Sequence, residues 1–204
     1  MSRRSSLARK PAKRDPAKKF VLYSEGKNTE PAYFRAFEAS LPGALIELEI
    51  IKAVGVPVTI AEAAAKRKKS KTALQPGDEV WAVFDRDAHP AFDRAIATCH
   101  DNGVGLAISN PCFELWLILH SEEFGRPDDR HQIQAHFQKL CPEYDPKGGK
   151  TPDCKVLVAD VLAAERRAEA QRSERAKDGA DHPMTTVDLL TKAMRAASLA
   201  FKGK

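Results

Sequence analysis

Residues 80–87 read VWAVFDRD: an apolar run that ends abruptly in Asp85 and Asp87. An upstream stretch of the same design, FVLYSEG at residues 20–26, ends in Glu25-Gly26. Short apolar runs bounded by turn residues are typical of buried strands. If both runs are parallel strands of one sheet, their carboxylates emerge at the same edge, where open α/β sheets place their ligand crevices.

The rest of the pattern predicts an α/β core. Strands are expected at residues 20–24, 46–54, 79–84 and 105–109, and helices at 29–41, 57–69, 90–100 and 112–120. Strands that alternate with helices of this length indicate crossover connections, and therefore a mainly parallel four-stranded sheet flanked by helices.

The strand signal ends near Phe124. Helices are predicted beyond it at residues 128–140, 153–177 and 186–201. The expected domains are a basic disordered tail at 1–18, the α/β core at 19–124, and a helical C-terminal extension at 125–204 that packs on the core.

Composition narrows the class of protein. The chain of 204 residues has no apolar run near the roughly 18 residues that span a bilayer, and its polar start does not resemble an export signal. Its four cysteines are widely spaced and form no C-x-x-C pair, so reduced thiols are expected. These features predict a cytoplasmic protein without a membrane partner.

The net charge of +5 is concentrated at the start of the chain. The first 19 residues hold eight Lys or Arg and one acid, and a second basic run lies at Lys66–Lys71. Basic arms often follow nucleic-acid phosphates. A solvated tail that only maintains solubility is an equally good interpretation of the first segment.

The carboxylates of Glu25, Asp85 and Asp87 predict a divalent-metal site. Acids gathered at one edge repel one another unless a hard cation neutralises them, and Mg²⁺ (or Mn²⁺) is the ordinary choice near phosphates. A D-x-D alone also fits haloacid-dehalogenase phosphatases, nucleotide-sugar glycosyltransferases or a solvated turn. Glu25 adds a metal ligand or proton shuttle, and Gly26 permits close approach of a phosphate to the backbone.

Further candidates lie around these acids. Asn110 is predicted to cap the helix that follows it, which directs Glu114 toward the same edge as a fourth ligand or as support for a bound water. The alternative for Glu114 is a first-turn acid favoured by the helix dipole. His89 follows the D-x-D and could donate to a phosphate, and His120 is expected to be a helix-terminal cation. The candidates for phosphate contact are Lys27, Arg35 and Arg86, together with the Gly26 backbone.

Three blocks carry a family resemblance: SEGKNTEP at 24–31 followed by Tyr33-Phe34, FDRD at 84–87, and SNPCFELWL at 109–117. The order of E-G and then D-x-D resembles the Toprim fold of topoisomerases, bacterial primases and nucleases of the overcoming-lysogenization-defect group. The three blocks together closely resemble the RloB-like family, which includes abortive-infection proteins.

The resemblance implies a Toprim-like core and a metal-dependent phosphodiesterase role in phage defence. It also implies a companion ATPase of the AAA/ABC type. By position, Glu25, Asp85 and Asp87 carry the catalytic and metal-binding acids of the motif.

The leading hypothesis is therefore a Mg²⁺-dependent nuclease that hydrolyses phosphodiesters of DNA or RNA. The alternative is a regulatory subunit of an ATPase complex that binds nucleotide or nucleic acid without cleaving it, with the helical segment 163–177 as the docking surface. A glycosyltransferase that uses Asp85 and Asp87 is a third interpretation. Homo-oligomer formation stays open.

Overall fold

The computed structural model describes residues 17–42, 46–52, 55–70, 72, 74–86, 91–145, 147–149 and 151–200. The predicted basic tail lies outside these residues, apart from Ala17 and the first residue of β1. All helices and strands named below belong to the described part of the chain.

A five-stranded sheet forms the centre of the molecule, in the order β2-β1-β3-β4-β5. The strands are β1 (Lys18–Ser24), β2 (Ile46–Lys52), β3 (Glu79–Asp85), β4 (Gly105–Asn110) and β5 (Met184–Thr185). The first four are parallel to their neighbours, and β5 pairs antiparallel with β4. The mainly parallel sheet is confirmed, but the prediction of four strands is wrong. A strand of two residues is too short to show the alternation on which strand prediction depends.

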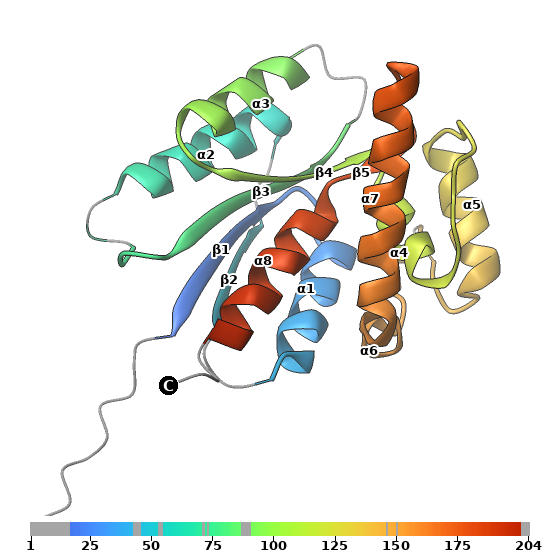
Figure 1. Cartoon of the computed structure of the whole chain (residues 1–204), viewed down its shortest axis with the longest axis horizontal. Coiled ribbons are helices and arrows are strands. Elements are labelled where there is room, and N and C mark those ends of the chain that lie inside the picture. Colours follow the sequence, from blue (N-terminus) through green and yellow to red (C-terminus); the bar gives the residue numbers. More distant parts are fainter. Residues whose placement is uncertain are drawn as a thin grey trace, which may run out of the picture.

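Helices cover both faces of the sheet (Figure 1). On one face lie α2 (Pro57–Lys69) and α3 (Phe92–Asp101), and on the other α1 (Thr29–Ser40) and α8 (Val187–Ala200). Beside the sheet lie α4 (Glu114–Ser121), α5 (Arg130–Leu140), α6 (Cys154–Leu157), the 3₁₀ turn η1 (Val158–Asp160) and α7 (Val161–Asp178). Of these, α6 and η1 contact α1, and α5 packs on α4 at the outer side.

The sheet separates two apolar cores because successive side chains of a strand point to opposite faces. In β1, Phe20 and Leu22 belong to the core shared with α1, α4, α7 and α8. Val21 and Tyr23 belong to the core shared with α2 and α3. Burial on both faces explains the nearly continuous apolar runs that predicted these strands.

Helix boundaries depart from prediction in two places. Asn110 does not cap the following helix: it ends β4, its peptide bond to Pro111 is cis, and α4 begins at Glu114 after the cap residue Phe113. The single helix expected at 153–177 is divided into α6, η1 and α7. Tertiary context often overrides local helix signals, so boundaries of this kind are not predicted from local sequence patterns.

The C-terminal third is part of the central structure. Besides adding β5, it contributes Leu190 and Met194 of α8 to the core that α1 and α4 also line. The Asp188 carboxylate of α8 is fully buried and accepts a hydrogen bond of 2.8 Å from Arg172 of α7. The C-terminal third, which was expected to be purely helical, therefore supplies one strand of the sheet.

All four cysteines are buried and unpaired, as expected from their spacing. Burial raises the pKa of Cys99 and of Cys154 to about 11, which keeps both thiols protonated. None of the helices in the described ranges combines the length and apolar composition needed to cross a membrane.

His120 links α4 to α1 inside the apolar core. Its Nδ1 lies 3.0 Å from the carbonyl oxygen of Trp116, which can only accept, so Nδ1 carries the proton. Nε2 then accepts from the Tyr33 hydroxyl at 3.0 Å. Burial lowers the pKa of His120 from 6.5 to about 4, so the prediction of a helix-terminal cation is wrong.

This depressed pKa predicts acid sensitivity. The unfolded chain takes up the His120 proton below pH 6.5 and the folded chain only near pH 4, so stability present above 6.5 is lost as the pH falls between these values. From about pH 7 to about pH 5, we expect this group to lower the free energy of unfolding by about 2 kcal/mol. Urea unfolding of wild type and His120→Gln at both pH values measures the difference. The exposed His100 of α3 supplies the control, and His100→Gln should retain the wild-type slope.

Candidate functional site

The carboxyl ends of β1, β3 and β4 lie side by side at one edge of the sheet. Ser24 pairs with Val83, and Asp85 pairs with Ser109. The main chain continues this alignment past the strands: the Glu25 amide donates to the Val83 carbonyl at 3.1 Å, and the Arg86 amide donates to Ser109 at 2.8 Å. Glu25 and Asp85 therefore leave the sheet on adjacent parallel strands.

Four acids interact electrostatically at this edge: Glu25, Glu30, Asp85 and Glu114, here termed the carboxylate cluster. Glu25 and Asp85 come from the ends of β1 and β3. Glu30 lies in the first turn of α1 and Glu114 in the first turn of α4. Glu30, Asp85 and Glu114 are buried or nearly so, with 9% of Glu30, 14% of the Asp85 side chain and 7% of Glu114 exposed.

Burial and repulsion by neighbouring acids destabilise the ionised forms of Glu30 and Asp85. The pKa of Glu30 rises from 4.5 to about 7, first because of burial and then because Glu114 and Glu25 are close. Burial, followed by the charge of Glu30, also holds the pKa of Asp85 well above its usual range. The cluster thus carries more negative charge than its surroundings stabilise.

Arg130 partly balances this charge. Its guanidinium donates to Asp85 Oδ2 at 2.6 Å. The residue is the first of α5, and a capping box formed by Asp129 and Gln132 defines where that helix begins. An arginine in a separate helix, 45 positions from its partner, leaves no motif in the sequence, so it was not predicted.

Glu114 is held by two side chains from outside the predicted core. The Tyr144 hydroxyl donates a short hydrogen bond to Glu114 Oε1, and Gln134 of α5 donates to the same oxygen at 3.3 Å. Burial, and then the charge of Glu114, strongly raises the pKa of Tyr144, which keeps its hydroxyl protonated as a donor. Neither residue was predicted, because only tertiary packing brings them to α4.

A cavity of about 190 Å³ adjoins the cluster. Glu30, Glu114 and Tyr144 line one part of it, and the rest is lined by Gly26, Lys27, Asn28, Thr29, Gln134, Asp145 and Gly149. A Cβ atom at Gly26 would collide with the Glu30 carboxylate, so the glycine leaves room for that side chain. Approach of a phosphate to the Gly26 backbone stays a prediction. Lys27 is exposed at this cavity, where a phosphate could reach it.

Three other predicted residues lie in different surroundings. Arg35 is exposed on α1, where its charge acts on Glu38. Arg86 forms an ion pair with Asp181, and its guanidinium lies 5.1 Å from the centre of the Phe92 ring. Asn110 donates to the Asp181 carbonyl at 2.6 Å, and therefore joins β4 to the turn before β5.

Two predicted residues, Asp87 and His89, lie outside the described residues. Of the D-x-D motif, Asp85 and Arg86 are described.

The basic run of α2 lies at the opposite edge of the sheet. Lys68 donates to the Asp78 carbonyl just before β3, and Arg67 donates to Glu49 at 2.7 Å. A strand of seven residues separates this edge from Asp85, which corresponds to about 20 Å. The run therefore does not flank the carboxylate cluster.

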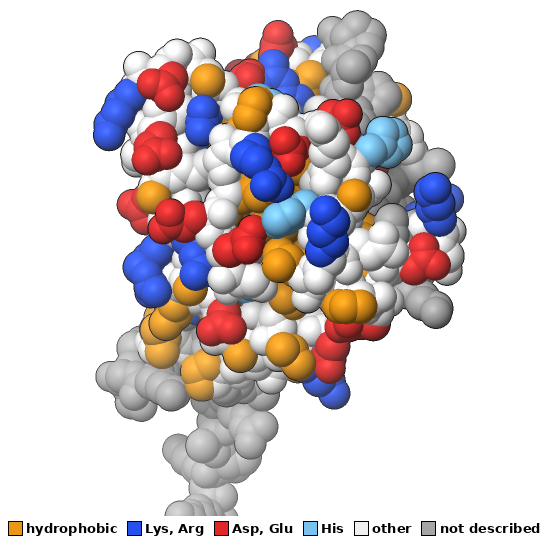
Figure 2. Space-filling view, turned by 90° about the vertical axis from the view of Figure 1, so that its right-hand side faces the viewer, with side chains coloured by type: hydrophobic (Ala, Val, Ile, Leu, Met, Phe, Trp, Pro, Cys, Tyr) orange, Lys and Arg blue, Asp and Glu red, His pale blue; other side chains and the backbone are white. Residues whose placement is uncertain are grey.

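Acidic, basic and hydrophobic side chains are interspersed on the side of the molecule that carries α5 (Figure 2).

The chemistry of the cluster fits a hard divalent cation, because its donors are carboxylate oxygens whose repulsion a cation would offset. Its geometry is not a finished coordination shell: among the described His, Cys, Asp and Glu side chains, no group of three is placed to hold one ion. As they are placed, Glu25, Asp85 and Glu114 do not form such a group. They would hold a cation only after their side chains rearranged, and Arg130 would have to yield Asp85 to it.

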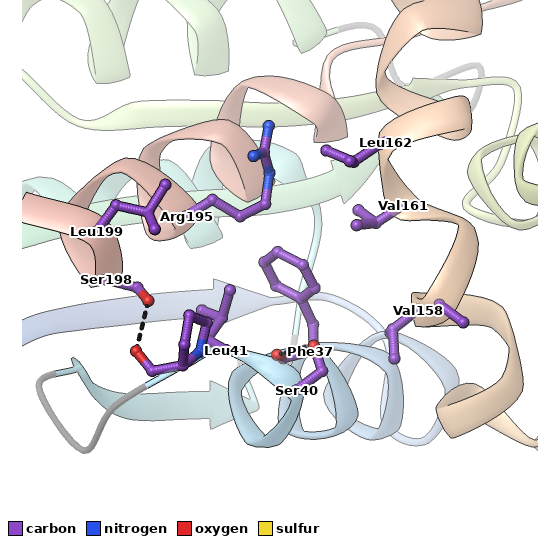
Figure 3. Close-up of a pocket in the computed structure, with 11 residues that line it drawn as sticks. Phe37, Ser40, Leu41, Val158, Val161, Leu162, Arg195, Ser198 and Leu199 are labelled. Atoms are coloured by element: carbon purple, nitrogen blue, oxygen red, sulfur yellow. Dashed lines mark hydrogen bonds between the residues drawn. The ribbon is translucent and has the colours of Figure 1, made fainter. Parts of the chain in front are cut away.

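A larger cavity, of about 390 Å³, lies away from the acids (Figure 3). Phe37 of α1, Val161 and Leu162 of α7, and Leu199 of α8 give it a mainly apolar lining. Arg195 beside it is paired with Glu165 at 2.5 Å. The lining is thus mainly apolar, in contrast to the acidic surroundings of the carboxylate cluster.

These features define a mixed α/β protein with a mostly parallel sheet and an acidic site at the carboxyl edge. The family model described as RloB-like protein matches residues 20–194, and the chain therefore belongs to the RloB-like family. Neither a curated protein nor a solved structure matches the chain. The matched residues include α5 and Tyr144, so the parts that complete the site fall within the family region.

The contact between Tyr144 and Glu114 predicts a stability effect. Tyr144→Phe leaves a buried carboxylate with one donor fewer, and we expect the free energy of unfolding to fall by about 1–3 kcal/mol. In a Glu114→Gln background the same change should cost less than about 1 kcal/mol, because the uncharged amide needs the donor less. Urea unfolding of the four proteins completes a double-mutant cycle. Tyr23→Phe, in the opposite core, controls for loss of a hydroxyl; equal losses in both backgrounds would contradict the coupling.

Proposed function

We propose that this protein is a metal-dependent nuclease that hydrolyses phosphodiesters of DNA or RNA with a Toprim-type arrangement of acids. One observation carries the proposal: Glu25 and Asp85 leave adjacent parallel strands and enter one buried carboxylate cluster. Repelling acids next to a cavity that Lys27 and the start of α1 line suit a cation and a phosphate together.

The residues divide into distinct roles. Asp85 and Asp87, with Glu25, would hold Mg²⁺ or Mn²⁺, which when bound supplies Lewis acidity and lowers the pKa of water. Glu25 is alternatively the general base or acid. Tyr144 and Gln134 orient Glu114, a further ligand or a support for the attacking water. Lys27 and the Gly26 backbone contact the phosphate.

A role in phage defence beside an AAA/ABC-type ATPase follows from the family resemblance. The resemblance is strongest in the blocks that supply Glu25, Asp85 and Glu114, which are also the acids of the cluster. The proposed biological role therefore depends on the same residues as the proposed chemistry.

Cleavage assays with purified protein test the nuclease. With Mg²⁺ or Mn²⁺ we expect cleavage of at least one of duplex DNA, single-stranded DNA, tRNA or unstructured RNA. Glu25→Gln and Asp85→Asn should each lower the rate by about 100-fold or more, because each removes a charge that holds the cation or moves a proton.

Glu62→Gln is the matched control, since Glu62 is an exposed acid of α2 that pairs with Arg94 at 2.8 Å. It should leave the rate unchanged. Cation-dependent cleavage that survives in both site variants would refute the assignment of these acids, and loss of cleavage in the control would point to a general effect of charge.

The second candidate, a non-cleaving subunit of an ATPase complex, is favoured by the apolar cavity in Figure 3. Its rim includes Leu162 and Leu199, which are 51% and 52% exposed. Exposed leucines around a hollow are a common feature of protein-binding surfaces.

Substitutions at the rim test this candidate without truncating α8, which belongs to the core. We expect Leu162→Asp combined with Leu199→Asp to lower copurification of the adjacent-gene ATPase by about tenfold, because each places a charge in an apolar contact. Leu189→Asp, at an exposed leucine of α8 that does not line this cavity, is the control. Unchanged recovery of the ATPase with the double variant would exclude docking here.

A further inference from the structure

We propose that Arg130 is an exchangeable counter-ion: it neutralises Asp85 while no divalent cation is bound, and contacts a nucleic-acid phosphate once a cation takes over Asp85. This inference rests on the proposed function and adds to it a residue that couples metal binding to substrate binding.

The ion pair itself is the first support. The Arg130 guanidinium lies 2.6 Å from Asp85 Oδ2, where the Asp85 side chain is only 14% exposed. Asp85 has three further carboxylates acting on it, and Arg130 opposes their effect on both Asp85 and Glu30. The guanidinium thus occupies the electrostatic position that a divalent cation would take with twice the charge.

The position of Arg130 allows the exchange. The Arg130 side chain is 35% exposed and that of Asp85 only 14%, so the pair lies between the buried cluster and solvent. Its backbone belongs to α5, which the capping box anchors at Asp129, and not to the strands that carry the acids. A flexible side chain on a fixed helix start can turn from Asp85 to an incoming group without movement of the sheet.

The chemistry of the side chain fits a phosphate. A guanidinium presents a planar fork of donors that matches two phosphate oxygens, and it stays charged at any working pH. The arginines expected from sequence to do this are less well placed: Arg86 is paired with Asp181, and Arg35 acts on Glu38. Within the described part of the chain, Arg130 is the arginine with an ion pair to the carboxylate cluster.

The exchange predicts opposite effects on the two ligands. Cation and Arg130 compete for Asp85, so Arg130→Gln should lower the Mn²⁺ dissociation constant by about tenfold. A phosphate gains Arg130 only after the cation binds, so the same variant should lose the increase in oligonucleotide affinity that the cation causes in wild type. Loss of an arginine that only stabilises the fold would not both tighten Mn²⁺ binding and abolish the cation-induced increase in oligonucleotide affinity.

Two binding measurements on the full chain decide the matter. Calorimetry with Mn²⁺ alone gives the metal affinity, and fluorescence anisotropy with labelled DNA and RNA oligonucleotides, in EDTA and in Ca²⁺, gives the cation-induced gain. Arg94→Gln, at an exposed arginine of α3 paired with Glu62, is the matched control and should behave as wild type. Circular dichroism establishes that each variant folds.

Arg130→Lys keeps the test decisive if the glutamine variant does not fold. It retains the charge but loses the fork, so the Mn²⁺ affinity should stay within about twofold of wild type while the cation-induced gain falls. An unchanged or weaker Mn²⁺ affinity in Arg130→Gln would overturn the proposal. So would a cation-induced increase in oligonucleotide affinity as large as that of wild type in either variant. Failure of the proposed function looks different, because wild type itself would then bind no Mn²⁺, or Asp85→Asn would bind it as well as wild type.

Discussion

Parallel pairing of β1 with β3 brings Glu25 and Asp85 out of the sheet side by side, and the negative charge that this concentrates is what the surrounding elements must balance. The first turns of α1 and α4 add Glu30 and Glu114 to the same place. Burial raises the free energy of ionised Glu30 and of ionised Asp85, and the neighbouring acids raise it further. An arrangement that is unfavourable in isolation is a reason to expect a charged ligand, since function and local stability often conflict at such sites.

The balance comes from residues far along the chain. Arg130 and Gln134 lie in α5 and Tyr144 in the loop beyond it, and they contact Asp85 and Glu114. These contacts make the C-terminal half part of the site, just as β5 and α8 make it part of the sheet and core. The predicted division into an α/β core and a helical extension therefore understates how much the acids depend on the extension.

The carboxylate cluster and the basic end of α2 lie at opposite edges of the sheet. The acids occupy the carboxyl edge, while the basic end of α2 lies about one strand length away near the start of β3. A nucleic acid that reached both would have to extend along the molecule. In the function that we propose, recognition at the acids themselves rests on close contacts from Lys27, the start of α1 and Arg130, and on a cation that offsets the repulsion.

The sequence by itself determined the parallel α/β core, because apolar runs buried on both faces and the helices between them are local patterns. It also determined that Glu25, Asp85 and Glu114 come to one edge, since residues that follow parallel strands meet there. It did not predict β5, whose two residues are too few to show a period. It also wrongly made Asn110 a helix cap, because the actual partner of Asn110, Asp181, is distant in the chain. Nor did it predict His120 as a neutral core residue, or Arg130 and Tyr144 as partners of the acids. Only the tertiary structure decided these, because burial and long-range contacts set the charge and the hydrogen bonding of a side chain, and neither is encoded in its neighbours along the sequence.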